Sequence, residues 1–124
     1  MRLLLDAHAL IWWLTASPSL TARARQAIAD PRNDIMLGIG TLWEITIKRS
    51  LGKLRFAHDL EVVVRNEGFG VIGVSFAHLR LVESLPQLHR DPFDRLLIAQ
   101  SLADQLPIVT GDRAFAAYGA TLIW

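Results

Sequence analysis

Four acidic side chains stand where the chain passes from one type of element to the next. Asp6 follows a run of three leucines, and Asp112 follows an apolar pair through a Thr-Gly step. Glu44 and Asp94 stand in the predicted first turns of two helices. In an open parallel α/β sheet, strand ends and the helix starts that follow them collect at one edge, where ligands bind. We therefore expect the four carboxylates to meet in one pocket.

Carboxylates gathered in this way require a positive charge. At about 5 Å and an effective dielectric near 20, each pair repels by about 3 kcal/mol, so cations or protons must neutralise them. Mg²⁺ and Mn²⁺ prefer oxygen ligands, need few protein carboxylates and retain several waters. Such a cation can bind phosphate oxygens, activate water and stabilise a leaving alkoxide. The predicted chemistry is metal-assisted hydrolysis of a phosphodiester.

Each acid also has a purely structural interpretation as a helix cap. Asp91 and Asp94 flank a Pro-Phe pair, which is a strong helix start with an acid three residues after the cap. Thr41 and Glu44 have the same capping-box spacing, and the other two acids could each cap the helix that follows. Capping explains one acid at a helix start, but not an acid at so many strand-to-helix transitions of one chain.

Size and composition fit one cytoplasmic domain spanning residues 1–124. A chain of 124 residues can bury about two-thirds of its unfolded surface, so it can fold without disulfide bonds or a structural metal. It has no cysteine, which excludes disulfides and thiolate metal sites. No apolar stretch reaches the ~18 residues of a membrane span, and Asp6 and His8 interrupt the apolar core of any signal peptide. The mean hydropathy of +0.30 indicates that a partner or second copy covers some apolar surface.

Strand and helix patterns alternate along the chain, which favours an α/β fold with a parallel sheet. The expected strands span residues 2–6, 35–37, 71–74, 108–109 and 121–124. The expected helices span residues 7–15, 21–29, 41–49, 58–66, 76–85, 92–105 and 113–118.

Four segments together resemble the PIN domain, and specifically the toxins of the VapC type. The segments, in chain order, are LLLDAHALIW (3–12), LWEITIK (42–48), HRDPFDRLLIAQ (89–100) and IVTGD (108–112). Any one of them is a weak signal, but the four in this order cover essentially the whole chain.

The resemblance implies a three-layer PIN-like fold, with a central parallel sheet of order 3-2-1-4-5 flanked by helices. It also implies a Mg²⁺- or Mn²⁺-dependent ribonuclease whose catalytic, metal-binding acids correspond to Asp6, Glu44, Asp94 and Asp112. Toxins of this type cleave structured RNA, commonly tRNA or rRNA, and stop translation. A cognate VapB-type antitoxin inhibits them, they usually form homodimers, and they reach promoter DNA only through the antitoxin. The alternative is a PIN-like module that binds RNA or protein without cutting.

Within the site, Asp6, Asp94 and Glu44 are the expected ligands of a main metal ion. Asp112 either supports a second ion or orients the attacking water, and the sequence leaves one ion or two open. Asp94 stands at the acid position of the family, so Asp91 is interpreted as the helix cap, with a secondary candidacy for the site.

Phosphate contacts are expected from basic residues near the acids, which supply salt-dependent affinity with little sequence information. The candidates are Lys48, Arg95 and Arg113; the competing interpretation is an ordinary solvated surface. Thr110 either hydrogen-bonds a ligand or simply ends a strand. The sequence carries no RNA-recognition motif.

The sequence leaves open the roles of the histidines and of two adjacent tryptophans. His8 is expected to orient or pack rather than to bind metal, and His78 is expected at the surface. His89 precedes the third segment and is a minor candidate for a substrate contact. Trp12 and Trp13 point in different directions on a helix, so either both are buried or one lies in a groove that the antitoxin covers.

Overall fold

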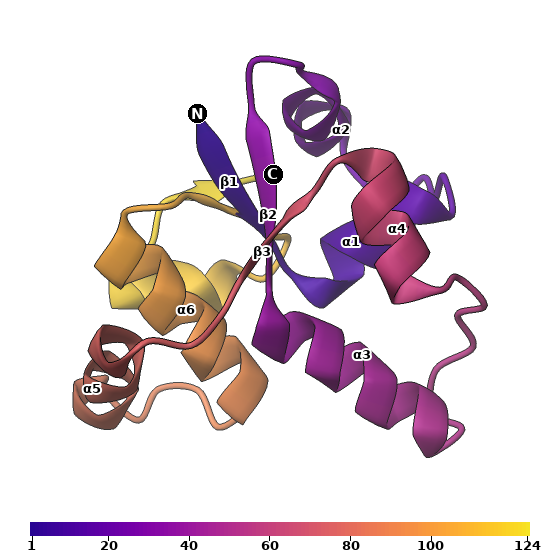
Figure 1. Ribbon diagram of the computed structural model, residues 1–124. Helices are drawn as coiled ribbons and strands as arrows, with labels where there is room; N and C mark the ends of the chain where they lie inside the picture. The colour runs from indigo at the N-terminus through magenta and orange to yellow at the C-terminus, as the bar shows by residue number, and fades with distance from the viewer.

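The computed structural model describes residues 1–124 and contains a five-stranded, fully parallel sheet between two layers of helices (Figure 1). The strand order is β3-β2-β1-β4-β5, which confirms the predicted α/β class and order. The strands are β1 (Arg2–Leu5), β2 (Asp34–Gly38), β3 (Gly70–Ile72), β4 (Ile108–Val109) and β5 (Leu122–Ile123). The helices are α1 (Ala7–Leu14), α2 (Ala22–Ala29), α3 (Ile39–Ser50), α4 (Leu60–Glu67), α5 (Phe76–Ser84), α6 (Pro92–Asp104) and the 3₁₀ helix η1 (Arg113–Tyr118).

Strand β1 lies at the centre of the sheet and contributes to both faces. Its three leucines are fully buried, as expected for a parallel strand covered on both sides. Because side chains alternate along a strand, Leu3 and Leu5 face one core and Leu4 faces the other. Leu5 pairs with Leu37 of β2 and with Val109 of β4, so the carboxyl ends of three strands meet beside the residue that follows it, Asp6.

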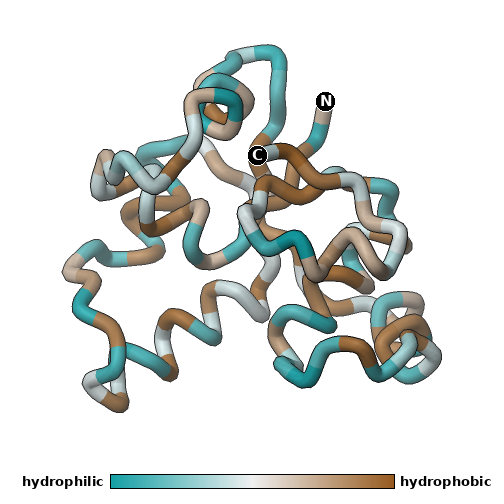
Figure 2. Tube along the Cα trace, turned by 180° about the vertical axis from the view of Figure 1, so that it is seen from behind, coloured by the Kyte–Doolittle hydropathy of each residue, from teal (hydrophilic) through white to brown (hydrophobic).

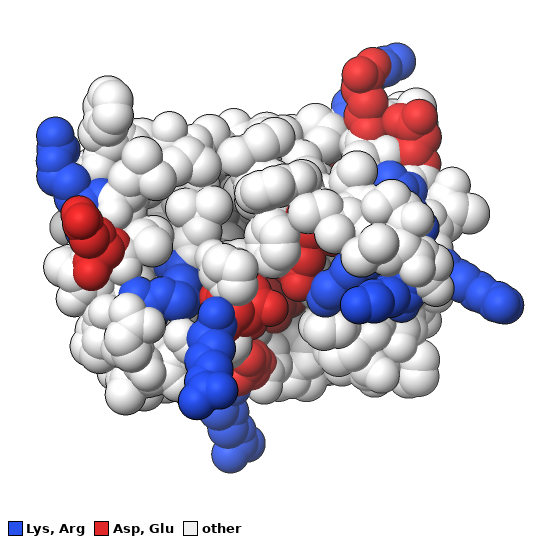
Figure 3. Space-filling view, turned by 90° about the horizontal axis from the view of Figure 1, so that it is seen from below, with Lys and Arg blue, Asp and Glu red and all other residues white.

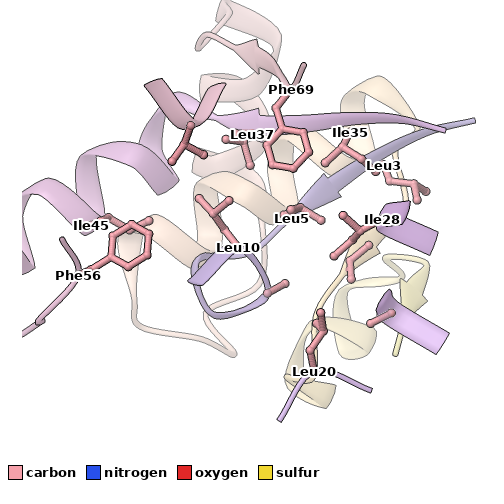
Figure 4. Close-up of a cluster of buried hydrophobic side chains, with 14 residues drawn as sticks. Leu3, Leu5, Leu10, Leu20, Ile28, Ile35, Leu37, Ile45, Phe56 and Phe69 are labelled. Atoms are coloured by element: carbon pink, nitrogen blue, oxygen red, sulfur yellow. The ribbon is translucent and has the colours of Figure 1, made fainter. Parts of the chain in front are cut away.

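The first core lies between the sheet and helices α1, α2, α3 and α4 (Figure 4). The second lies between the sheet, α6 and η1, where Leu97, Ile98 and Phe115 pack against Leu4. Helices α1, α2 and α4 lie on one side of the sheet and α5 and α6 on the other (Figure 1). Apolar stretches run through the middle of the molecule, and many outer turns are hydrophilic (Figure 2). None of the helices has both the length and the apolarity needed to cross a membrane.

Helix α3 begins two residues earlier than predicted, and this changes the interpretation of Glu44. The helix follows β2 directly and starts at Ile39, with Gly38 as its N-cap and no side-chain cap hydrogen bond. The predicted capping box of Thr41 and Glu44 is therefore wrong, and Glu44 lies in the second turn. Both side chains are buried, which is incompatible with a simple solvent-exposed cap.

Two small residues let α3 approach α6 closely. A Cβ atom on Gly40 would lie 2.7 Å from the Leu96 side chain, and one on Gly38 would lie 2.6 Å from Oε1 of Gln100. Only glycine gives this separation without displacing a neighbour. The close packing brings the helix that carries Glu44 next to the helix that carries Asp94.

Candidate active site

A pocket of about 150 Å³ opens at the carboxyl edge of the sheet, and all four predicted acids line it. Its nine lining residues are Asp6, Ala7, His8, Glu44, Lys48, Asp91, Asp94, Asp112 and Phe115. Acidic side chains gather in the middle of this face, with Lys and Arg side chains on either side (Figure 3). The expected meeting of carboxylates from four distant parts of the chain is therefore present.

Asp6 is held by hydrogen bonds to both of its carboxylate oxygens. The backbone N–H of Ala9 donates to Oδ1 at 2.7 Å, so Asp6 caps α1. The hydroxyl of Thr110 donates to Oδ2. Burial raises the pKa of Asp6, while the bonds from Thr110 and Ala9 lower it and the charge of Asp112 raises it. A buried carboxylate held this rigidly is suited to bind a cation at a fixed place.

Thr110 connects Asp6 to Asp112 rather than facing a ligand. Its side chain is 1% exposed, and its oxygen also accepts a hydrogen bond of 3.0 Å from the backbone N–H of Asp112. The predicted direct contact between Thr110 and a ligand is not supported, because the side chain is buried and its hydroxyl is already bonded to Asp6 and Asp112. Thr110 is instead a positioning residue for two of the acids.

His89 is the functional candidate that the sequence reasoning underrated. Its Nε2 lies 3.2 Å from Oδ2 of Asp94 and 3.6 Å from Oδ2 of Asp112. Each of these three residues has one atom that could bind a metal ion, and the three atoms lie within 4.8 Å of one another. The backbone N–H of Asp91 donates to Nδ1 of His89 at 3.2 Å, so in the neutral ring the proton is on Nε2. The Nε2 side of the His89 ring therefore faces both carboxylates.

The carboxylates around Asp94 oppose its ionisation. Burial, followed by the charges of Asp91, Glu44 and Asp112, raises the pKa of Asp94 to about 7, although the charge of His89 opposes the rise. Without a cation, Asp94 therefore titrates near neutral pH. The donor atoms are mostly carboxylate oxygens, which fits the preference of Mg²⁺ and Mn²⁺.

Glu44 and Lys48 form an ion pair on one wall of the pocket. Nζ of Lys48 lies 2.8 Å from Oε2 of Glu44, one helical turn away. The hydrogen bond to Glu44 raises the pKa of Lys48, so the ammonium stays charged. The Lys48 side chain is 44% exposed, whereas that of Glu44 is 9% exposed. Lys48 therefore lies partly at the surface while Glu44 stays in the pocket, and its predicted phosphate contact stays a prediction.

Asp91 has the predicted capping role. Its Oδ1 accepts hydrogen bonds from the backbone N–H groups of Phe93 at 2.8 Å and Asp94 at 3.1 Å. It also lines the pocket and raises the pKa of Asp94. It therefore combines a structural role with an electrostatic effect on the neighbouring acid.

Arg95 is not placed to contact a phosphate, which corrects that prediction. Its residue is 6% exposed, and its guanidinium donates to the backbone carbonyls of Val82, Leu85 and Pro86. Arg95 therefore holds the end of α5 and the following turn against α6. Arg113 is exposed beside Asp112, so its predicted phosphate contact stays a prediction.

His78 is buried rather than at the surface, contrary to prediction. Its Nδ1 accepts from the backbone N–H of Ser75, and its Nε2 lies 2.9 Å from Oδ2 of Asp104. This capping box at the start of α5 explains the burial.

Comparison with known proteins agrees with the fold. The family model described as "PIN domain" matches residues 3–120. No curated protein matches the chain in sequence.

Among solved structures, the chain is similar to one in the crystal structure of VapBC2 from Rickettsia felis bound to a DNA fragment from their promoter. The TM-score is 0.72 at 14% identity, covering 98% of this chain and 97% of the other. For FitAcB from Neisseria gonorrhoeae, the TM-score is 0.65 at 16% identity, with 98% and 96% covered. For a toxin–antitoxin complex from Klebsiella pneumoniae, it is 0.60 at 20% identity, with 92% and 90% covered.

Proposed function

This chain belongs to the PIN-domain family, and we propose that it is a Mg²⁺- or Mn²⁺-dependent endoribonuclease acting as the toxin of a toxin–antitoxin pair. The observation that carries the proposal is the pocket in which Asp6, Glu44, Asp94 and Asp112 meet at the carboxyl edge of the sheet. A non-catalytic binding module would have no need to hold four carboxylates together against their repulsion.

The four acids are the residues that would hold the cation. When bound, a divalent cation supplies positive charge to a phosphodiester and lowers the pKa of water. The hydrogen bonds from Ala9 and Thr110 keep Asp6 fixed. The His89 ring lies beside both Asp94 and Asp112. Asp112 is the most exposed of the four acids, which suits it to orient the attacking water or to support a second ion.

Basic side chains around the acids are proposed to hold the RNA backbone. Lys48 borders the pocket and Arg113 stands next to Asp112. Phosphate contacts of this kind give affinity that falls with salt. Following the family resemblance, the substrate is structured RNA, tRNA or rRNA, whose cleavage in the cytoplasm would stop translation.

A VapB-type antitoxin is the proposed partner. The solved neighbours include chains from complexes described as toxin–antitoxin or VapBC. Here, a pocket of about 370 Å³ lies between α1 and α4, bordered by Trp13, Leu14 and Val62. Trp13 is half-buried there, and its Nε1 donates to Glu67 at 3.3 Å. An aromatic anchor in such a groove suits an apolar antitoxin segment.

A homodimer is also proposed, and DNA would be reached only through the antitoxin. Trp43 on α3, and Phe76 and Leu79 on α5, are large apolar side chains at least half exposed. Apolar surface of this kind favours contact with a second copy.

Cleavage of RNA tests the proposed function. Wild-type protein should cut tRNA or rRNA with Mg²⁺ or Mn²⁺, and excess chelator should stop the cutting. Asp6→Asn should reduce cleavage to the level seen with chelator, while Asp34→Asn, an exposed acid at the start of β2, should leave it unchanged. RNA binding without cleavage by wild-type protein in either metal would favour the non-catalytic module.

A paired substitution tests the assignment of the third acid. Asp94→Asn should abolish cleavage, whereas Asp91→Asn should leave some, because Asp91 acts on the helix start. Loss of activity with Asp91→Asn alone would reverse this assignment.

A further inference from the structure

A second hollow adjoins the acid pocket and shares part of its wall. Its volume is about 270 Å³, and its lining residues are Asp6, His8, Trp12, Ser19, Gly111, Asp112 and Trp124. Asp6, His8 and Asp112 also line the acid pocket. The two hollows therefore lie on either side of the same acidic side chains.

Aromatic rings form much of this second hollow. The indole rings of Trp12 and Trp124 lie with centroids 5.8 Å apart and planes tilted by 50°, and the His8 ring lies 5.3 Å from Trp12. Rings tilted in this way do not stack flat on each other, so part of each ring face stays available for contact with another ring. Both tryptophans are partly exposed.

Trp124 lies against the backbone that carries Asp112. A Cβ atom on Gly111 would be 2.8 Å from Cε2 of the Trp124 indole, closer than real side chains approach. Glycine at this position lets the indole contact the main chain immediately before Asp112. The Trp124 side of the hollow therefore packs directly against the segment that carries Asp112, a predicted metal ligand.

We propose that this second hollow binds a nucleobase of the RNA strand, next to the phosphate held at the acid pocket. The inference rests on the proposed function, since it requires a nucleic acid substrate. Aromatic side chains bind unpaired bases by stacking, and a neutral base is better accepted than a phosphate beside Asp6 and Asp112. Ser19 adds a hydroxyl at the wall that can hydrogen-bond a base edge.

The four tryptophans provide a direct readout of base binding. In protein with ¹⁵N-labelled indoles and Mg²⁺, adenosine 5′-monophosphate and uridine 5′-monophosphate should shift the Nε1–H signals of Trp12 and Trp124. The signals of Trp13, on the other side of α1, and of exposed Trp43 should not move. Ribose 5-phosphate, which lacks a base, should leave all four unchanged. Equal shifts with ribose 5-phosphate, or shifts confined to Trp13 and Trp43, would overturn the proposal.

Substitution gives a second, independent measurement. Trp12→Leu should weaken binding of the monophosphates about ten-fold, as loss of one stacking contact does, whereas Trp12→Phe should keep most of the affinity. Trp13→Leu removes the neighbouring indole from the other groove and is the matched control, with unchanged affinity. Thermal unfolding of each variant shows whether it is folded. A folded Trp12→Leu variant that binds like wild type would overturn the base pocket.

The two proposals fail in different ways. Metal-dependent RNA cleavage together with silent Trp12 and Trp124 signals would overturn the base pocket alone. Base-dependent shifts in a protein that cuts no RNA would overturn the nuclease and support the pocket.

Discussion

Replacement of Asp94 by asparagine should stabilise the metal-free protein while destroying its metal site. The pKa of Asp94 rises from 3.8 to about 7 because of burial and the surrounding carboxylates. A shift of about 3 units corresponds to ~4 kcal/mol of lost stability when the group is ionised. The side chain is 26% exposed, so solvent screening reduces this to ~1–2 kcal/mol. For a domain of this size, Asp94→Asn should raise Tm by roughly 3–8 °C.

The effect has a definite dependence on pH. An acid whose pKa is raised on folding destabilises the folded state fully above the raised value, and the penalty disappears as pH falls towards the unfolded value. The gain in Tm of Asp94→Asn should therefore be largest at pH 8 and fall to less than half at pH 5.

Thermal unfolding in excess chelator, monitored by circular dichroism, measures the gain. Asp34→Asn, an exposed acid outside the pocket, controls for loss of a negative charge. An Asp94→Asn variant with a Tm at pH 8 equal to or below that of wild type would refute the claim that burial and the neighbouring carboxylates oppose the ionisation of Asp94.

Three further outcomes are expected. Thr110→Val should reduce RNA cleavage roughly 10- to 100-fold, as loss of a residue that orients a metal ligand does; unchanged cleavage would show that the hydrogen bond to Asp6 is dispensable. Arg95→Met should lower the free energy of unfolding by ~1–3 kcal/mol, because three backbone carbonyls, one of them in a buried hydrogen bond, lose their donor. Arg113→Met should stay within about 0.5 kcal/mol of wild type, and urea unfolding of the two variants measures both effects. Mn²⁺ affinity should fall about ten-fold per pH unit below the Asp94 pKa of about 7, since binding must displace a proton; calorimetry at pH 8, 7 and 6 that gave constant affinity would contradict this.

The placement of the acids could be predicted because it follows from local sequence. A continuously apolar strand ending in Asp6, and an apolar pair leading to Asp112, put both acids at the carboxyl edge of a parallel sheet. The strong cap at Asp91 likewise fixes the start of α6 and so the position of Asp94.

The start of α3 could not be predicted from local preference. Ile39, Gly40 and Thr41 are poor helix formers, so the pattern favoured a later start. Packing of the two glycines against α6 supplies contacts that local sequence does not reveal, and they extend the helix to β2. As a result, Glu44 reaches the pocket from the second turn.

The roles of His89 and Arg95 depend on contacts far along the chain. His89 stands in a loop with no periodic pattern, and its position is set by the hydroxyl of Tyr118, to which its backbone N–H donates at 2.7 Å. Arg95 has the sequence signature of an exposed helical residue, but carbonyls 9 to 13 residues earlier surround it. Only the folded arrangement of α5 and α6 reveals these partners.

Calorimetric titration of Mg²⁺ and Mn²⁺ into chelator-treated protein tests most directly whether the carboxyl groups share a cation. Wild-type protein should bind with saturation, and Asp6→Asn, Glu44→Gln, Asp94→Asn and Asp112→Asn should each bind more weakly at pH 8, while Asp34→Asn should match wild type. The account would be contradicted if wild-type protein showed no saturable binding of either cation. It would also be contradicted if all four site variants bound the cation with the affinity of wild type.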